Sequence, residues 1–283
     1  MNLYIMTRGR VGKQYTLSRL PLSWFNKTFL VCPTNEEHRV GNVINAPPWV
    51  NNYSAKFQWI LDGMPVSHEG PWGTEVQERL CKDEKAVIMD DDLVFSERNA
   101  DGKLITIRDP EELSPMFEQM EALLDTYPLV GVHPRQMGQH TKPPYVENGR
   151  IICIQGINRR LIGPTKVDQF PILADVVLNC TVLARGGRNA IITTYFQDHG
   201  PCQAEGGCSI YRTSEMQKAA VEYIAERFGP FAKVVKRRTQ AGWLEQNGER
   251  HDYTCQWKRL HAAGAAHVLD PGAVPHPDKE ARR

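Results

Sequence analysis

The sequence has no long apolar run, no marked excess of one charge and no paired spacing of cysteines. No apolar run approaches the ~20 residues that a membrane-spanning helix needs, and the N-terminal MNLYIMTRGR lacks the apolar region of a signal peptide. The 283 residues carry 34 basic and 33 acidic side chains, so a nucleic-acid partner requires a local basic patch. We expect a cytoplasmic protein with no membrane partner.

The seven cysteines are scattered along the chain, and their number is odd. This pattern predicts free thiols in a reducing compartment rather than a disulfide framework. Only His199, Cys202 and Cys208 lie close enough in the sequence to suggest a metal. A structural zinc site needs four ligands, usually with more closely spaced cysteines, and no fourth ligand is evident. Loop thiols are therefore the favoured interpretation, and a metal at these three residues is the alternative.

Strand-like and helix-like segments alternate along residues 1–260. Such alternation is typical of an α/β protein, so we expect a Rossmann-like mixed open sheet flanked by helices. After Leu260 the composition changes to Ala, Gly, Pro, His and charged residues, which predicts a flexible tail over residues 261–283. Predicted strands include LYIMT, KTFLVCP, AVIMDDD, LVGVHP, RIICIQGI, NAIITTYFQ, KVVKRR and DYTCQWKRL, and predicted helices are SAKFQWIL, DPEELSPMFEQMEALLDTYP, VDQFPILADVVLNCTVLARGG and TSEMQKAAVEYIAERFG.

Polar residues follow several of the predicted strands at the point where each strand ends. In an open α/β sheet, ligands bind beyond the carboxyl ends of the strands. We therefore expect residues 7–10, 33–35, 90–92 and 133–135 to lie on one edge of the sheet. Basic residues and carboxylates on the same edge suit a phosphorylated ligand that is carried with a divalent metal.

Three consecutive carboxylates, Asp90 to Asp92, end the predicted strand in AVIMDDDLVF. Close like charges near a protein surface cost on the order of 1 kcal/mol per pair, so we expect a compensating cation. A D-x-D pattern at a strand end supplies two hard oxygen ligands. Such ligands suit Mg²⁺ or Mn²⁺, which accept substrate phosphates as further ligands.

Several classes of protein need carboxylates placed in this way. A haloacid-dehalogenase phosphatase uses D-x-D-x-[TV] near its N-terminus, but here the triplet comes only after two earlier predicted strands. A metal-dependent nuclease or other nucleic-acid phosphoryl-transfer enzyme is an alternative, although no matching upstream glutamate is evident. A nucleotide-sugar glycosyltransferase of the GT-A type has its D-x-D after the third or fourth strand, and this layout fits best. A non-catalytic DNA-binding module with a plain acidic turn is the remaining alternative.

The ordered series of segments along residues 1–260 carries a resemblance to a known family. The segments are YIMTRGR, NNYSAKFQWIL, VIMDDDLVF, GVHPRQMG, NGRIICIQGINRRL and DHG…EGGCSIYRT. The chain resembles the GT-A-type glycosyltransferases that modify DNA bases in bacteriophages, a group related to the base J and hydroxymethylpyrimidine modification systems. The resemblance implies a single GT-A-like domain over residues 1–260, with a nucleotide-sugar-binding half at about 1–95 and an acceptor half at about 96–260. It also implies the host cytoplasm if a phage encodes the chain.

The resemblance further implies how the donor, a nucleotide-diphosphate sugar and foremost a UDP-sugar, is bound. Asp90 and Asp92 would hold Mn²⁺ or Mg²⁺ against the diphosphate, and Asp90 or Asp91 would reach the ribose. His199 would complete the metal shell, since neutral imidazole is a good ligand. Ordinary solvated charge is the alternative role for each basic residue of the set. The expected donor-binding residues are Thr7, Arg8, Gly9, Arg10, Lys56, Asp90, Asp91 and Arg135.

An inverting transferase also needs a carboxylate base near the acceptor hydroxyl. Related enzymes often carry it in a Glu-Asp pair at the start of a helix in the second half. Here the segment reads PILADVVL, with Ala174 where the glutamate would stand, which leaves Asp175 as the candidate. Asp198 is the second candidate and Asp168 a further competitor. A retaining mechanism would need no such base, and the stereochemical outcome stays open.

A DNA acceptor requires positive charge and aromatic side chains near the site. Three basic clusters, in NRRL, KVVKRRTQAGW and QWKRL, meet this requirement, and a solvated surface is the alternative interpretation of each. Phosphate contacts from such residues make binding fall steeply with salt. The expected DNA-binding residues are Arg159, Arg160, Lys236, Arg237, Arg238 and Trp243.

The resemblance thus implies a metal-dependent transfer of a sugar to a hydroxymethylated pyrimidine in DNA. The expected acceptor is 5-hydroxymethylcytosine or a sugar already attached to it. A glycosyltransferase with a protein, lipid or small-molecule acceptor is the alternative within the same chemistry. Donor sugar, strand preference and oligomeric state are not encoded in any short motif.

Overall fold

The computed structural model of the chain describes residues 1–69, 75–137, 144–199, 205–238, 248–272 and 276–280. Its largest element is a ten-stranded open sheet with the order β3-β2-β1-β6-β11-β9-β12-β7-β8, in which β10 pairs with β12. The protein therefore has the predicted mixed α/β architecture with a Rossmann-like open sheet. The strands are β1 (Asn2–Met6), β2 (Thr28–Pro33), β3 (Asn42–Ala46), β6 (Lys85–Asp90), β7 (Leu93–Arg98), β8 (Leu104–Thr106), β9 (Leu129–Pro134), β10 (Tyr145–Glu147), β11 (Ile154–Asn158) and β12 (Asn189–His199).

Most of the strands that are followed by polar residues end at the same edge of the sheet. Strands β1, β2, β3 and β6 run parallel to one another. Strand β11 is antiparallel to both β6 and β9, so β9 again points the same way as β6, and β12 is parallel to β9. The C-terminal ends of β1, β2, β6, β9 and β12 therefore share one edge, which confirms the predicted placement of the residues that follow the first four of them.

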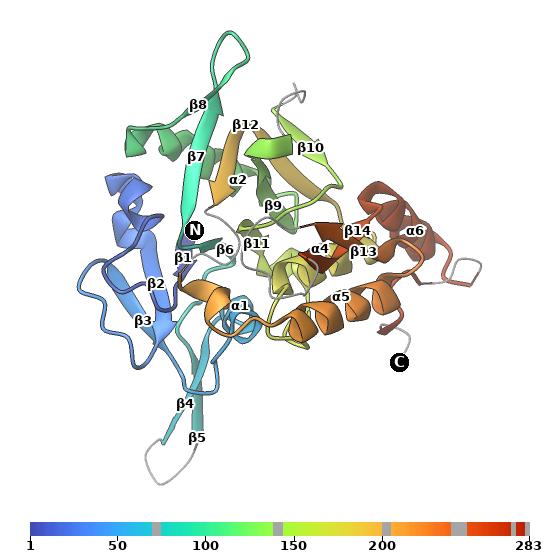
Figure 1. Cartoon of the computed structure of the whole chain (residues 1–283), viewed down its shortest axis with the longest axis horizontal. Helices are drawn as coiled ribbons and strands as arrows, with labels where there is room; N and C mark the ends of the chain where they lie inside the picture. The colour runs from blue at the N-terminus through green and yellow to red at the C-terminus, as the bar shows by residue number, and fades with distance from the viewer. Residues whose placement is uncertain (70–74, 138–143, 200–204, 239–247, 273–275, 281–283) are drawn as a thin grey trace.

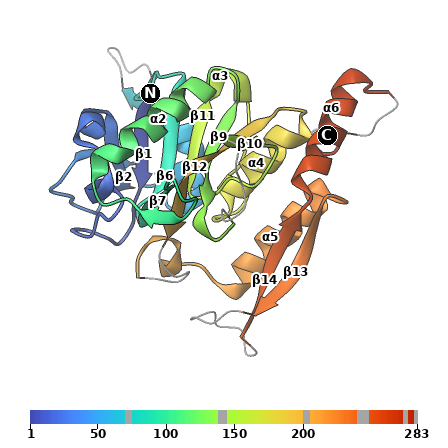
Figure 2. The same ribbon diagram turned by 90° about the horizontal axis from the view of Figure 1, so that it is seen from above.

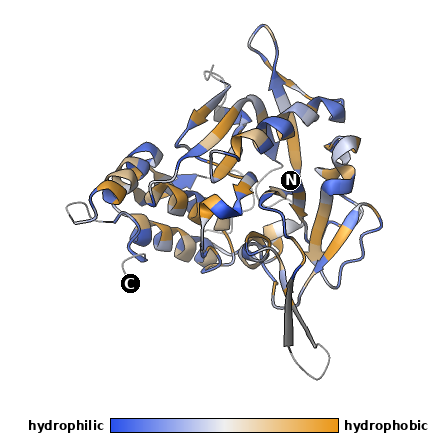
Figure 3. Ribbon diagram, turned by 180° about the vertical axis from the view of Figure 1, so that it is seen from behind, coloured by the Kyte–Doolittle hydropathy of each residue, from blue (hydrophilic) through white to orange (hydrophobic). Residues whose placement is uncertain are grey.

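Helices cover both faces of the large sheet (Figures 1 and 2). Helices α1 (Tyr53–Leu61) and α4 (Ala174–Ala184) pack on one face, and α2 (Ser114–Leu123) packs on the other. Each face has its own buried apolar cluster because alternate strand residues, such as Tyr4 and Ile5, point to opposite sides. In Figure 3 the strands of the sheet are mostly hydrophobic and the helices carry both colours. The short helices are η1 (Leu17–Arg19), η2 (Leu22–Lys27), η4 (Pro110–Leu113), η5 (Arg135–Met137), α3 (Arg159–Ile162) and η6 (Gly207–Ile210).

Local sequence signals account for where several helices begin. Asn52 caps α1 by accepting from the Ala55 N–H at 2.9 Å, and Asp109 caps η4 as its sequence position predicts. The cap of α5 (Ser214–Phe228) is Thr213, whose hydroxyl accepts from the Met216 N–H.

Two hairpins and a last helix extend from this core. The β4 (Pro65–Glu69) and β5 (Glu75–Arg79) hairpin projects from the sheet below α1 in Figure 1. The predicted strands KVVKRR and DYTCQWKRL correspond to β13 (Ala232–Arg238) and β14 (Glu249–Cys255), which pair with each other and pack along α5, although the second prediction runs on into the next helix. Helix α6 (Trp257–Leu269) follows and packs against α4. No helix in the described part of the chain is long and apolar enough to cross a membrane.

The prediction of a flexible tail after residue 260 is wrong for the described part of that segment. Helix α6 continues to Leu269, and a Cβ on its Gly264 would lie 2.5 Å from the Leu183 carbonyl oxygen, so α6 packs tightly on α4. Farther on, Asp278 is fully buried and forms a bidentate ion pair with Arg227 of α5 at 2.9 and 2.8 Å. The polar composition of the segment hides this anchor because its partner is far away in the sequence.

We predict that removing one partner of this buried pair destabilises the fold. Asp278→Ala leaves the Arg227 guanidinium buried without its counter-ion, and we expect the free energy of unfolding to fall by about 3–5 kcal/mol. The matched control is Glu280→Ala, because Glu280 contacts the same arginine at 3.1 Å but its side chain is 42% exposed. The control should cost at most about 1 kcal/mol. Urea denaturation measures both, and an unchanged stability of Asp278→Ala would show that the tail is not anchored in this way.

Candidate active site

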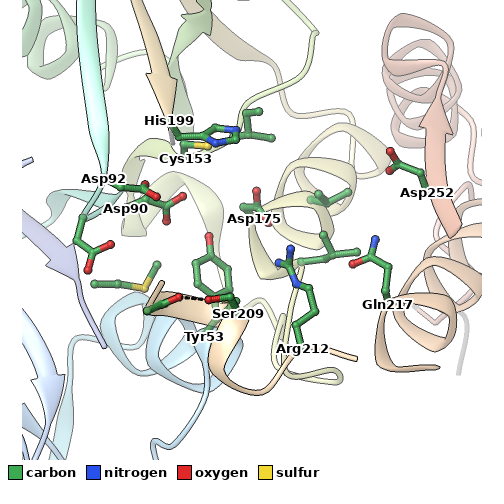
Figure 4. Close-up of a pocket in the computed structure, with 18 of the residues that line it drawn as sticks. Tyr53, Asp90, Asp92, Cys153, Asp175, His199, Ser209, Arg212, Gln217 and Asp252 are labelled. Atoms are coloured by element: carbon green, nitrogen blue, oxygen red, sulfur yellow. Dashed lines mark hydrogen bonds between the residues drawn. The ribbon is translucent and has the colours of Figure 1, made fainter. Parts of the chain in front are cut away.

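A cavity of about 250 Å³ opens at the edge of the sheet where β1, β6 and β12 end. Its walls come from segments far apart in the sequence, and Figure 4 shows Asp90, Asp92 and His199 toward one end and Arg212 and Asp252 toward the other. The described residues that line it are Met6, Arg10, Tyr53, Asp90, Asp91, Asp92, Arg150, Ile152, Cys153, Leu173, Asp175, Val176, His199, Gly206, Gly207, Cys208, Ser209, Arg212, Gln217, Arg250, Asp252 and Tyr253.

The carboxyl group of Asp90 lies at the end of β6 among other acids. Burial raises its pKa well above the ordinary value, and the charges of Asp92, Asp175 and Asp91 raise it further. The backbone holds this position firmly, because the Asp90 N–H donates to the Cys153 carbonyl at 2.9 Å. A carboxyl group in these surroundings is stabilised as an anion only by a nearby cation.

The other two aspartates of the triplet share Arg10 as a partner. The Arg10 Nη1 atom donates to Asp91 Oδ1, and its Nη2 atom lies 3.2 Å from Asp92 Oδ2. Asp91 is only 3% exposed, and burial raises its pKa while Arg10 lowers it. The sequence prediction assigned Arg10 to the donor phosphates. The structure instead uses its guanidinium to compensate two of the three carboxylates.

The loop after β1 is interlocked with the segment that follows β12. The Arg10 Nε atom donates to the Glu205 carbonyl at 2.9 Å, and the Gly207 N–H donates to the Arg8 carbonyl at 2.8 Å. Gly9 and Gly206 both have positive φ, and a Cβ on Gly206 would lie 2.5 Å from Arg10 Cγ. Glycine is required at both positions because a side chain would separate the two loops.

The remaining predicted donor-binding residues have different surroundings. The Gly9 N–H donates to Glu36 Oε1 at 2.7 Å, and Arg8 donates to the Asn51 carbonyl and lies over the Tyr211 ring at 5.3 Å. Thr7 is buried and accepts from Gln14 Nε2 at 3.2 Å. These three residues belong to the loop after β1, but they are not among the described residues that line the cavity.

Lys56 of α1 is buried beneath the loop and supports it from below. Its side chain is 4% exposed, and its ammonium group donates to the Thr7 carbonyl at 2.6 Å. Burial lowers the pKa of Lys56 to about 8, against the opposing effect of Glu36 and other nearby acids. Neither sequence-based interpretation of Lys56, as a donor ligand or as an exposed helix lysine, predicted this supporting position.

Asp175 occupies the first turn of α4 and lies between the two ends of the cavity (Figure 4). Burial raises its pKa, whereas hydrogen bonds from the Val176 and Asp175 backbone and the charges of Arg150 and Arg212 lower it. The preceding Leu173 also lines the cavity and has left-handed backbone angles, φ 67° and ψ 23°. Such strain in a leucine is costly and is concentrated at functional sites. The structure thus brings Asp175 into the same cavity as Asp90 and Asp92.

The two competing base candidates are placed elsewhere. Asp198 precedes His199 on β12, so its side chain points to the other side of the strand, and its Oδ1 accepts from the His199 N–H at 3.0 Å. Asp168 lies 3.8 Å from Lys166. Neither is among the described lining residues, whereas His199 is. Of the suggested trio with His199, Cys208 also lines the cavity, and Cys202 lies outside the described residues.

The far end of the cavity contains residues that the sequence did not reveal as a group. Arg150, Arg212, Gln217, Arg250, Asp252 and Tyr253 come from a loop, from α5 and its approach, and from β14. Arg250 contacts Asp252 at 3.1 Å, and Arg237 of β13 contacts the same carboxylate at 3.2 Å. Arg150 and Arg212 stood inside segments that carried the family resemblance. No spacing rule, however, links them to β14.

The acidic end of the cavity fits a divalent cation that arrives with its own further ligands. No group of three or more His, Cys, Asp and Glu side chains within the described ranges is arranged as a ready metal site. Asp90 and Asp92 nevertheless line one wall, with His199 beside them. Mg²⁺ characteristically uses one or two carboxylates together with waters and substrate phosphates. Asp90, whose pKa is raised, and Asp92 together supply the two carboxylates of that donor set.

Several predicted contact residues are not in the cavity. Arg159 and Arg160 lie at the opposite edge of the sheet, because β11 runs antiparallel to β6. Arg159 donates to the carbonyls of Ile60, Leu61 and Asp83, and Arg160 pairs with Glu84 at 2.9 Å. The Arg159 guanidinium is therefore used within the fold, and Arg160 lies at the opposite edge of the sheet from the cavity.

The other predicted contact residues lie at the surface or outside the described residues. Arg135 follows β9 on the expected edge but donates to Thr106 at 3.1 Å and is not among the described lining residues. Lys236, Arg237 and Arg238 are exposed on β13, beside the far end of the cavity. Trp243 lies outside the described residues.

Comparisons with known proteins give no family assignment: no protein-family model matches the chain, and no curated protein matches it.

Lys56 gives a prediction for the pH dependence of stability. Its pKa is about 8 in the folded protein and 10.5 in an unfolded chain. Below pH 8 both states hold the proton, and burial of the charge opposes folding. Between about pH 8 and 10.5 the unfolded state holds a proton that the folded state has released, so the free energy of unfolding rises with pH by up to about 3 kcal/mol.

Comparison with Lys56→Met isolates this effect from other groups that titrate in the same range. We expect the stability of the natural protein, relative to Lys56→Met, to increase between pH 7.5 and 10.5 in urea denaturation. Parallel pH profiles for the two proteins would mean that Lys56 is not buried as a charged group.

Proposed function

We propose that the protein is a metal-dependent glycosyltransferase of the GT-A type. It moves a sugar from a nucleotide-diphosphate donor, foremost a UDP-sugar, to 5-hydroxymethylcytosine or a sugar already attached to it in DNA. The observation that carries this proposal is the position of Asp90 and Asp92. Asp90 ends the fourth strand of the large sheet in chain order and Asp92 follows it, and a third half-buried acid, Asp175, lines the same cavity.

The strand order supports a nucleotide-binding first half. Four parallel strands, β3-β2-β1-β6, form one side of the sheet, and β11 then reverses direction. Ligands of such sheets bind beyond the strand ends. The edge formed by residues 7–10 and 90–92 is therefore the expected place for the nucleotide and its diphosphate. Ion pairs from Arg10 to Asp91 and Asp92 hold these two segments together.

A divalent cation would be held by Asp90 and Asp92, with His199 beside them, and when bound it would stabilise the negative charge that develops on the departing nucleoside diphosphate. The chain's own residues prepare this position. Arg10 compensates Asp91 and shares Asp92, so the carboxylate of Asp90 is the one most in need of a cation.

Asp175 is the residue suited to accept the proton of the acceptor hydroxyl. It is half-buried, burial raises its pKa above the ordinary value, and it lies between the acidic end and the arginine-rich end of the cavity. The hydroxyl oxygen would attack the anomeric carbon of the donor sugar as the bond to the diphosphate oxygen breaks. The proton of that hydroxyl would pass to an Asp175 carboxylate oxygen.

The transfer itself is tested with DNA that contains 5-hydroxymethylcytosine and a panel of nucleotide sugars with Mn²⁺. After digestion to nucleosides, mass spectrometry should show an added mass of one sugar for one donor. The same donors with protein, lipid and small-molecule acceptors distinguish a different acceptor. An absence of transfer to any acceptor with any donor would contradict the proposal.

We predict that Asp92 is needed for the binding of nucleotide with metal. A nucleoside diphosphate with Mn²⁺, at about 100 times its Kd, should stabilise the protein by about 2.7 kcal/mol, read as a rise in Tm. The rise should be absent in Asp92→Asn. It should persist in Asp101→Asn, which changes an exposed aspartate in the β7–β8 turn. Equal stabilisation of both variants would exclude Asp92 as a ligand.

The two base candidates from the sequence now give opposite predictions. Asp175→Asn should lower kcat about 10²–10⁴-fold while nucleotide binding is retained. Asp198→Asn should keep its rate, because that side chain points away from the cavity. Steady-state kinetics of the transfer reaction measures both. A loss of activity in Asp198→Asn together with an active Asp175→Asn would reverse the assignment.

A further inference from the structure

A second cavity, of about 470 Å³, lies beside the candidate active site and shares one wall with it. Arg150 lines both cavities. The rest of the second cavity comes from the end of β9, from β10 and the loop after it, and from the start of α6. Its described lining residues are His133, Pro134, Val146, Glu147, Asn148, Gly149, Arg150, Ile191, Gln256, Trp257, Lys258 and Arg259.

Arg150 has an unused hydrogen-bonding group at the boundary between the cavities. Its Nε atom is buried and has no hydrogen-bond partner among the residues that the structure describes. Its guanidinium lies over the Tyr253 ring at 5.5 Å and interacts electrostatically with Asp175 and Asp252. A buried guanidinium nitrogen without a partner costs free energy, and an anionic ligand would supply the missing acceptor.

The charges of the first cavity are unevenly distributed along its length. Arg10 faces three carboxylates at the acidic end, whereas Arg150, Arg212 and Arg250 surround only Asp175 and Asp252 beyond it. Arg237 adds a further positive charge, 3.2 Å from Asp252. The acidic end suits a cation, and the excess of arginines on the acceptor side suits an anion.

The second cavity combines an aromatic surface with basic residues. Trp257 is half-buried on its wall, and its ring meets the Tyr253 ring edge-on at 6.3 Å. Lys258 and Arg259 follow at its exposed rim, with His133 on another side. Val146 and Ile191 make the interior apolar. An aromatic platform beside basic side chains is the arrangement that binds a base and its phosphate in single-stranded nucleic acids.

We propose that the second cavity binds the nucleotide next to the acceptor nucleotide in a nucleic-acid strand. Its base stacks on Trp257, and the phosphate that joins the two nucleotides is held by Arg150. This inference rests on the proposed function, because the acceptor nucleotide must reach Asp175 in the first cavity. It also implies that the strand is locally unstacked at the site, since neighbouring bases occupy separate cavities.

The test compares the binding of short acceptors, without any need for turnover. Fluorescence anisotropy competition measures the Kd of 5-hydroxymethyl-deoxycytidine monophosphate and of the dinucleotides that extend it on either side. One of the two extensions should lower the Kd about 5–150-fold in the natural protein, in line with about 1–3 kcal/mol for one stacked base. In Trp257→Ala that gain should vanish, and in Trp257→Phe most of it should remain.

Two further variants separate a specific site from general surface effects. Arg150→Met should weaken binding of the dinucleotide about 10–100-fold and reduce the slope of log Kd against log salt by about one. Trp49→Ala serves as the matched control, because Trp49 is 62% exposed and does not line either cavity in the described part of the chain. It should leave both Kd values unchanged.

The binding of nucleoside diphosphate with Mn²⁺, measured on the same protein samples, distinguishes the two proposals. If this complex forms but neither extension tightens binding, the inference about the second cavity is overturned and the donor chemistry stands. If neither complex forms, both proposals fail. Loss of the extension gain in Trp49→Ala to the same degree as in Trp257→Ala would also overturn the inference.

Discussion

The ion pair of Arg10 with Asp91 and Asp92 is the interaction on which the candidate site depends. It connects three parts of the chain: the loop after β1, the end of β6, and, through the contact with the Glu205 carbonyl, the segment after β12. Without a cation at this point, three adjacent carboxylates would repel one another at the end of a buried strand. The ion pair compensates the charges of Asp91 and Asp92, so the carboxylate of Asp90 is left to bind another cation.

The charged residues are distributed asymmetrically along the cavity. At one end the acids exceed the bases, and at the other end the arginines exceed the acids, with Asp175 between them. A donor diphosphate with its metal suits the first end, and an anionic acceptor suits the second. The strained Leu173 and the tightly packed Gly206 form part of the cavity walls, so the arrangement is built into the fold before any ligand binds.

The sequence predicted the edge of the sheet correctly because strand ends are local features. An apolar run followed by polar residues identifies each end, and a parallel sheet then brings the ends together. Predictions about individual side chains were less successful. Arg159 looked like a phosphate ligand but donates to three backbone carbonyls. Lys56 looked exposed or ligand-binding and is buried under Thr7. The partner of Asp278 is 51 positions away, which no local pattern reveals.

The central claim is that Asp90 and Asp92 hold a divalent cation together with a nucleoside diphosphate. Anomalous scattering from crystals grown with Mn²⁺ and a nucleoside diphosphate tests it most directly. The account predicts a single strong manganese peak between the carboxylates of Asp90 and Asp92 and the diphosphate oxygens. Manganese bound elsewhere, or a nucleotide placed away from the loop of residues 7–10, would contradict it.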